Sequence, residues 1–93
     1  MEDQFFTLFA GLIGINNLAG TTLMSQNHGA AVNLRGPAVA IGSITVSVTD
    51  NHIITDREPA FSIGATQGLF TDNLTRPNNF VPTTIVQATN III

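Results

Sequence analysis

The stretch SITVSVTDNHIITD, residues 43–56, carries the clearest structural signal in the chain. From residue 44 to residue 49, branched apolar side chains alternate with Thr and Ser, and this period of two is typical of a half-buried strand. The pair Asp50-Asn51 is typical of a turn, and a β-branched run follows at residues 53–55. The pattern predicts a β-hairpin over residues 43–56, whose first strand begins as early as Val39.

Short β-prone runs separated by turn residues occupy the rest of the chain, at residues 21–24, 30–34, 60–63, 66–70, 83–88 and 90–93. Regular short strands with such turns favour a sandwich or a barrel. We therefore predict an all-β fold, a single small antiparallel sandwich or jelly roll over residues 20–93. The pair Ile-Gly begins at residues 13, 41 and 63, but the spacings are unequal, so we predict no internal repeat.

An almost uninterrupted apolar run, FFTLFAGLIGI, fills residues 5–15. It supplies about half of the roughly 20 apolar residues that a membrane-spanning helix needs. Glu2 and Asp3 precede it, whereas a signal peptide begins with a basic region. Gly11 and Gly14 count against a stable helix, so we expect an extended segment. Residues 1–19 are predicted to form an apolar N-terminal connector arm that precedes the β domain.

The C-terminal end is as apolar as the N-terminal run, because the sequence finishes with three isoleucines. Burying one such side chain stabilises a protein by roughly 1.5–3 kcal/mol, so both ends need cover. Either both ends are core strands of their own subunit, or one end completes the sheet of a neighbouring subunit by strand addition. On the second alternative, the predicted subunit-interface residues are Phe5, Phe6, Leu8, Phe9, Leu12, Ile13, Ile15, Ile91, Ile92 and Ile93.

Composition restricts the function classes. The net charge is −3 with only three cationic side chains, which argues against nucleic-acid binding and against attraction to anionic membranes. Only 10% of residues are charged, whereas a soluble monomer usually has a surface with about 25–35% charged residues. The chain has no cysteine, so disulfides and thiol chemistry are excluded. We expect a protein whose main partners are copies of itself, in a homopolymer or a trimer-based stack.

Candidate catalytic residues are few. Asp50, His52 and Asp56 lie close together in the sequence, and His28 is the second histidine. No nucleophile-elbow pattern surrounds Ser43, Ser47 or Ser62, and the histidines and carboxylates match no metal-ligand spacing. The sequence therefore predicts no enzyme activity, no cofactor and no metal site. Asp50 and Asn51 are interpreted as turn residues, with His52 at the edge of the turn.

An uncharged-polar β domain without Lys, behind a short apolar N-terminal arm, resembles the small jelly-roll subunits of Bacillus spore-surface appendages. The resemblance implies a jelly roll over residues 20–93 and a connector at residues 5–15 that docks into an adjacent subunit, with an anchoring protein as a further partner. It also implies an extracellular, spore-surface or cell-surface location without a classical signal peptide. The expected function is a self-assembling structural subunit of a filament; the alternatives are a small β-sandwich binding module and a phage or capsid-like structural protein.

Overall fold

The computed structural model describes residues 1–9, 13–32 and 34–93, and these residues form strands, turns and loops without a helix. The strands in chain order are β1 (Phe5–Phe9), β2 (Ile13–Ser25), β3 (His28–Val32), β4 (Val39–Thr49), β5 (His52–Thr55), β6 (Phe61–Gly64), β7 (Gln67–Thr71), β8 (Leu74–Arg76), β9 (Asn79–Phe80), β10 (Val86–Ala88) and β11 (Ile91–Ile92).

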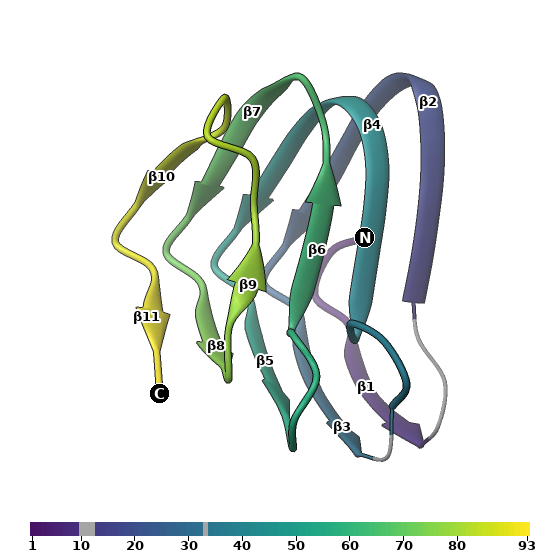
Figure 1. Cartoon of the computed structure of the whole chain (residues 1–93), viewed down its shortest axis with the longest axis vertical. Helices are drawn as coiled ribbons and strands as arrows, with labels where there is room; N and C mark the ends of the chain where they lie inside the picture. The colour runs from purple at the N-terminus through teal and green to yellow at the C-terminus, as the bar shows by residue number, and fades with distance from the viewer. Residues whose placement is uncertain (10–12, 33) are drawn as a thin grey trace.

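The strands form two sheets, and the chain passes from one sheet to the other and back again. One sheet has the order β1-β3-β5-β8-β11. In the other, the long strand β4 pairs with β2 on one side and with β6 and β7 on the other, and β9 and β10 extend these last two. Every strand pairing among the described residues is parallel. Each turn is therefore laid beside the previous one, and Figure 1 shows the resulting parallel β-solenoid.

The prediction of an antiparallel sandwich or jelly roll is wrong, although the all-β class is right. Period-two alternation and turn residues occur in both architectures, because both have strands with one buried face. The direction of the connections distinguishes them. In this chain the connections at the corners lead the backbone into the other sheet. A strand therefore pairs with its neighbour in the same sheet only after the chain has completed one full coil of the solenoid.

The predicted hairpin over residues 43–56 is wrong for the same reason. β4 and β5 follow each other closely, but they belong to different sheets, and β5 pairs with β3 and β8. A two-residue type I′ hairpin needs positive φ at both turn residues. In the pair Asp50-Asn51 only Asp50 has positive φ, at 57°. The turn between these strands is therefore a corner of the solenoid, while the predicted start of the first strand at Val39 agrees with β4.

The pairing of the strands shows a structural repeat that is not evident from the unequal Ile-Gly spacings. Val39 is the partner of Phe61, Ile41 of Ile63 and Val48 of Phe70, all at an offset of 22 residues. Two of the three Ile-Gly pairs are thus stacked on each other, so the prediction of no repeat is wrong. The other turns have different lengths: the offsets are 24 between β3 and β5, 23 between β1 and β3, and 17 between β8 and β11.

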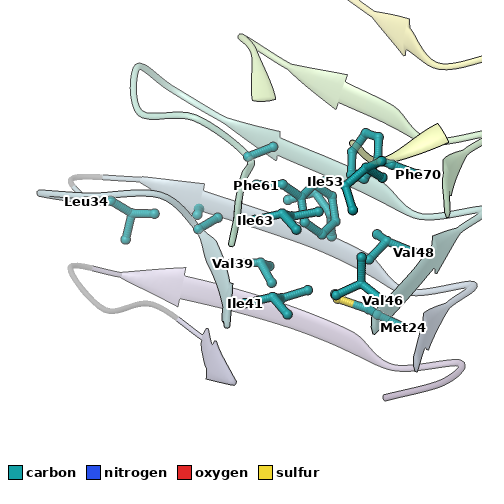
Figure 2. Close-up of a cluster of buried hydrophobic side chains, with 14 residues drawn as sticks. Met24, Leu34, Val39, Ile41, Val46, Val48, Ile53, Phe61, Ile63 and Phe70 are labelled. Atoms are coloured by element: carbon teal, nitrogen blue, oxygen red, sulfur yellow. The ribbon is translucent and has the colours of Figure 1, made fainter. Parts of the chain in front are cut away.

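The core lies between the two sheets and is built from the inward-facing positions of successive turns. Along β4 the buried apolar side chains are those of Val39, Ile41, Val46 and Val48, whereas Ile44 is exposed. Inward positions recur in β6 and β7. Phe61 and Phe70 are fully buried and meet edge to face, with ring centroids 5.2 Å apart. Figure 2 shows the labelled core residues: Met24, Leu34, Val39, Ile41, Val46, Val48, Ile53, Phe61, Ile63 and Phe70.

The N-terminal apolar run supplies strands to this same solenoid. Residues 5–9 form β1, which pairs with β3 in register, and residues 13–25 form β2 beside β4. The expected extended conformation agrees with these strands, and the expected boundary between residues 19 and 20 falls inside β2. Gly11 and Leu12 lie outside the described residues.

Candidate functional site at the ends of the solenoid

A ladder of amide side chains runs the whole length of the solenoid at one corner. The residue before each ladder position has positive φ: 51° at Asp3, 55° at Gln26, 57° at Asp50, 58° at Asp72 and 55° at Thr89. This left-handed conformation turns the backbone sharply, and Asp adopts it more readily than most residues. The residues that follow these corners in the sequence are Gln4, Asn27, Asn51, Asn73 and Asn90. The four asparagine side chains are stacked on one another, and Gln4 joins this ladder through its backbone N–H.

Each step of the ladder repeats one backbone-to-side-chain hydrogen bond in the same direction. The backbone N–H of one rung donates to the side-chain oxygen of the next: Asn27 N to Asn51 Oδ1 at 3.1 Å, and Asn51 N to Asn73 Oδ1 at 3.0 Å. The side-chain amides add parallel bonds, with Asn27 Nδ2 at 2.8 Å from Asn51 Oδ1. Asn27, Asn51 and Asn73 are at most 1% exposed. A buried amide is costly unless it is paired, so these residues specify the register of the turns.

The amide groups also hold each turn to the backbone of the turn before it. Asn51 Nδ2 donates to Met24 O at 3.1 Å, Asn73 Nδ2 to Val48 O at 3.0 Å, and Asn90 Nδ2 to Phe70 O at 2.7 Å. The ladder therefore has a polarity along the solenoid axis. The backbone N–H group of each ladder residue before Asn90 donates to the next turn, toward the C-terminal end. The hydrogen bonds from these Nδ2 groups to backbone carbonyl oxygens run to the previous turn, toward the N-terminal end.

The ladder ends differently at the two ends of the solenoid. At the N-terminal end, Gln4 N donates to Asn27 Oδ1 at 3.2 Å, and Gln4 Nε2 folds back onto Glu2 O at 3.0 Å. The side-chain oxygen of Gln4 has no hydrogen bond within the part of the chain that the structure describes. At the other end, Asn90 Oδ1 accepts from Asn73, while the backbone N–H of Asn90 meets no acceptor among the described residues.

The C-terminal turn leaves apolar side chains uncovered. Val86 is 60% exposed, and Ile91, Ile92 and Ile93 are 54–58% exposed. Ile92 stands in the same column as Ile53, which is fully buried, because Ile53 pairs with Thr75 and Thr75 pairs with Ile92. Ile92 thus stands in a core column, and no further turn of the solenoid covers it among the described residues.

The predicted interface residues separate into two groups at the two ends. Phe5, in β1, is 80% exposed, whereas Phe6, Leu8, Ile13 and Ile15 are partly buried against the core of their own chain. Phe9 ends β1 in register with Val32, and Leu12 lies outside the described residues. β11 and the residue after it contain Ile91, Ile92 and Ile93 at the opposite edge. The fold brings together the members of each group and keeps the two groups at opposite ends (Figure 1).

Shallow grooves lie on the side walls formed by the described residues, and two of them are well defined. The first, about 500 Å³, lies on the face of the β1-β3-β5 sheet and is lined by Phe5, Phe6, Thr7, His28, Gly29, Ala30, His52 and Ile54. The second, about 540 Å³, crosses β2, β4 and β6 over small residues such as Gly14, Ala40 and Ser62. Neither groove contains a charged side chain.

Three of the candidate catalytic residues, Ser43, Asp50 and His52, lie in different surroundings. Ser43 is buried in β4, and its hydroxyl is hydrogen-bonded to that of Thr22. Asp50 is an exposed corner residue, and His52 lies on β5 in the other sheet. Among the described residues, no group of three or more His, Cys, Asp or Glu side chains is arranged to hold a metal ion.

The ladder asparagines are the residues that the sequence analysis missed. The triplet Thr-Asp-Asn occurs at 49–51 and again at 71–73, the same offset of 22 residues that separates the two stacked Ile-Gly pairs. Two motifs at one offset would have indicated the repeat. The sequences at two other corners, Ser-Gln-Asn at 25–27 and Ala-Thr-Asn at 88–90, share only the Asn with this triplet.

Comparison with protein-family models, with curated proteins and with solved structures found no match to this chain. Within the described residues, no helix is long and apolar enough to cross a bilayer. The class to which the chain is assigned therefore rests on its own geometry, that of a parallel β-solenoid with an internal amide ladder.

Proposed function

We propose that this β-solenoid is a structural subunit that assembles with copies of itself, end to end, by parallel strand addition. The observation that carries the proposal is the complementarity of the two ladder ends. Asn90 offers an unused backbone N–H, and Gln4 offers an unused side-chain oxygen, which is the pair that every internal step of the ladder joins.

A second copy placed on the C-terminal end would continue the ladder without a change in pattern. Its Gln4 would accept from Asn90 N, as Asn73 accepts from Asn51 N at 3.0 Å. Its β1 would lie against β11, and its Phe5 would follow Ile91 in the column that runs from Phe5 through His28, His52 and Leu74. Unpaired strand edges recruit further strands, so the two edges favour such a contact.

The apolar side chains supply the affinity. Ile92 is 56% exposed at a core position, and Phe6 occupies the equivalent column of the first turn. Stacking would cover Ile92 with Phe6 of the next copy. Full burial of one such side chain contributes roughly 1.5–3 kcal/mol. The molecule measures 30 × 26 × 23 Å, so one end face is close in size to the roughly 800 Å² that each partner buries in a standard interface.

The contact joins two different surfaces, so it is heterologous, and every subunit of the stack has the same orientation along the axis. A parallel stack continues the solenoid axis, and the expected product is therefore a fibre as wide as one subunit. The jelly roll that the resemblance to spore-appendage subunits implied is not the observed fold. In the proposed fibre, whole turns of the solenoid stack on each other, and no free arm docks into a neighbour.

The experiment is to follow assembly of the purified chain against concentration, by sedimentation velocity and negative-stain electron microscopy. The test variant is Ile92→Asp, which places a carboxylate where the next copy would cover it. A buried unpaired charge costs several kcal/mol, so this variant should remain monomeric. We expect the unsubstituted chain to form unbranched fibres at concentrations at which Ile92→Asp sediments as a monomer.

Ile44→Asp is the matched control. Ile44 is 44% exposed on the long middle strand β4, away from both ends, so the same substitution should leave assembly intact. A chain that stays monomeric at several hundred micromolar, or equal assembly by Ile92→Asp and the unsubstituted chain, would refute the proposal.

A further inference from the structure

The two histidines of the chain, far apart in the sequence, are neighbours on the outer face of the solenoid. His28 in β3 and His52 in β5 are register partners in adjacent parallel strands. Their ring centroids lie 5.8 Å apart, with an angle of 57° between the ring planes. Both side chains line the shallow groove on this sheet, together with Thr7, Ala30 and Ile54.

The sheet holds the backbone of both histidines, and a phenylalanine ring packs against one of the imidazoles. Phe5 stacks on the other side of His28 at 4.9 Å, with its ring only 13° from parallel. The backbone N–H groups of both histidines take part in the stacking of the turns: His28 N donates to Gln4 O and His52 N donates to Asn27 O, each at 2.8 Å. The Cα positions are therefore set by the sheet, and only the side-chain torsions remain free to adjust.

We propose that His28 and His52 together bind one divalent transition-metal ion, with water completing the coordination. Imidazole suits zinc, copper and nickel. Metal–nitrogen bonds of about 2.0–2.1 Å require the two ligating nitrogens to lie roughly 3.3 Å apart in tetrahedral geometry. Neighbouring strands are about 4.8 Å apart, so two outward-facing imidazoles in register reach that separation by small side-chain rotations.

The neighbours leave room for the water ligands. Ala30 and Thr7 are small and line the groove beside the rings. Among the described residues no third protein ligand completes a cluster, so the ion keeps several waters and is held by two bonds from the protein. Affinity should follow the general order for divalent ions, with Cu²⁺ bound more tightly than Ni²⁺ or Zn²⁺, and Mn²⁺ more weakly. Only neutral imidazole binds a metal, so affinity should fall on acidification.

The test is a calorimetric titration of the tag-free chain with Cu²⁺ and with Zn²⁺. The sequence contains two histidines and no cysteine, so His28 and His52 supply all of its imidazole ligands and it has no thiol ligand. We expect one ion per chain, and an affinity reduced at least tenfold in His28→Ala and in His52→Ala. Unchanged affinity in both single variants, or tight binding that survives in the double variant, would overturn the proposal.

A rescue variant makes the test depend on the pairing of the rings. Leu74 is the register partner of His52 on its other side, in β8, and is partly exposed on the same column. Leu74→His in the His28→Ala background restores two imidazoles on adjacent strands and should recover most of the affinity. In the unsubstituted chain, Cu²⁺ should broaden the ring-proton resonances of both histidines at one equivalent. Broadening of one ring only would contradict shared coordination.

Discussion

Replacing Asn51 with alanine should lower the stability of the whole solenoid, although the residue lies at a corner. Asn51 is 1% exposed and makes four side-chain hydrogen bonds in the middle of the ladder. Alanine would leave Asn27 N, which is 3.1 Å from Asn51 Oδ1, without an acceptor. It would also remove the donors to Met24 O and to Asn73 Oδ1.

The magnitude follows from the groups that are left unpaired. A buried polar group without a partner costs about 1–3 kcal/mol, and each lost hydrogen bond a further 0.5–1.5 kcal/mol or so. Asn27 Nδ2 keeps Met1 O and Ser25 O as acceptors, which limits the loss. We expect Asn51→Ala to reduce the free energy of unfolding by about 2–5 kcal/mol. For a domain of this size that corresponds to a fall in Tm of at least roughly 10 °C.

The assay is urea denaturation and thermal melting, both followed by circular dichroism. Asn16→Ala is the matched control, because Asn16 is exposed on β2, in register with Gly42. This control should stay within about 0.5 kcal/mol of the unsubstituted chain. If Asn51→Ala and Asn16→Ala unfold at the same urea concentration, the ladder does not stabilise the fold and the reasoning is refuted.

Two glycines provide further predictions. Gly68→Ala should lower the denaturation midpoint strongly, because Gly68 has φ of 140° and an added Cβ would lie 2.0 Å from Val46 O. Gly36→Ala is the control and should change the midpoint little, because its Cβ would meet no atom within 4 Å. Equal effects of the two variants would contradict this explanation. Gly29→Ala should also destabilise the folded chain, because the added Cβ would lie 2.1 Å from the Phe6 ring. Adding Phe6→Leu to this variant should recover part of the lost stability. If a double-mutant cycle shows no recovery, the Phe6 ring is not the obstacle.

The strand positions were largely predictable from local sequence. Alternation over residues 44–49 and the β-branched run at 53–55 predict β4 and β5, because a strand with one buried face needs that period in any sheet. The Asp50-Asn51 corner was predictable as a turn, since Asp readily adopts positive φ. Pairing could not be predicted in the same way, because an apolar strand face packs equally well in parallel and antiparallel sheets.

The candidate sites were less predictable than the strands. The apolar character of residues 5–15 and of the final isoleucines was visible in the sequence, but not which of those side chains the chain covers itself. The structure buries Phe6 partly against its own core and leaves Ile92 at 56% exposure. Likewise, His28 and His52 become a pair only because a turn of 24 residues brings them into register.

The sequence by itself determined that the chain is built from strands, where most of those strands lie, that its charge is low, and that apolar side chains are found near both ends. These properties depend on each residue and its near neighbours. Only the tertiary structure decided that the strands are parallel and that Gln4, Asn27, Asn51, Asn73 and Asn90 form one ladder. The physical reason is that the bonds between successive ladder residues join positions 17 to 24 apart, so their energy appears only when a complete turn of the solenoid has closed.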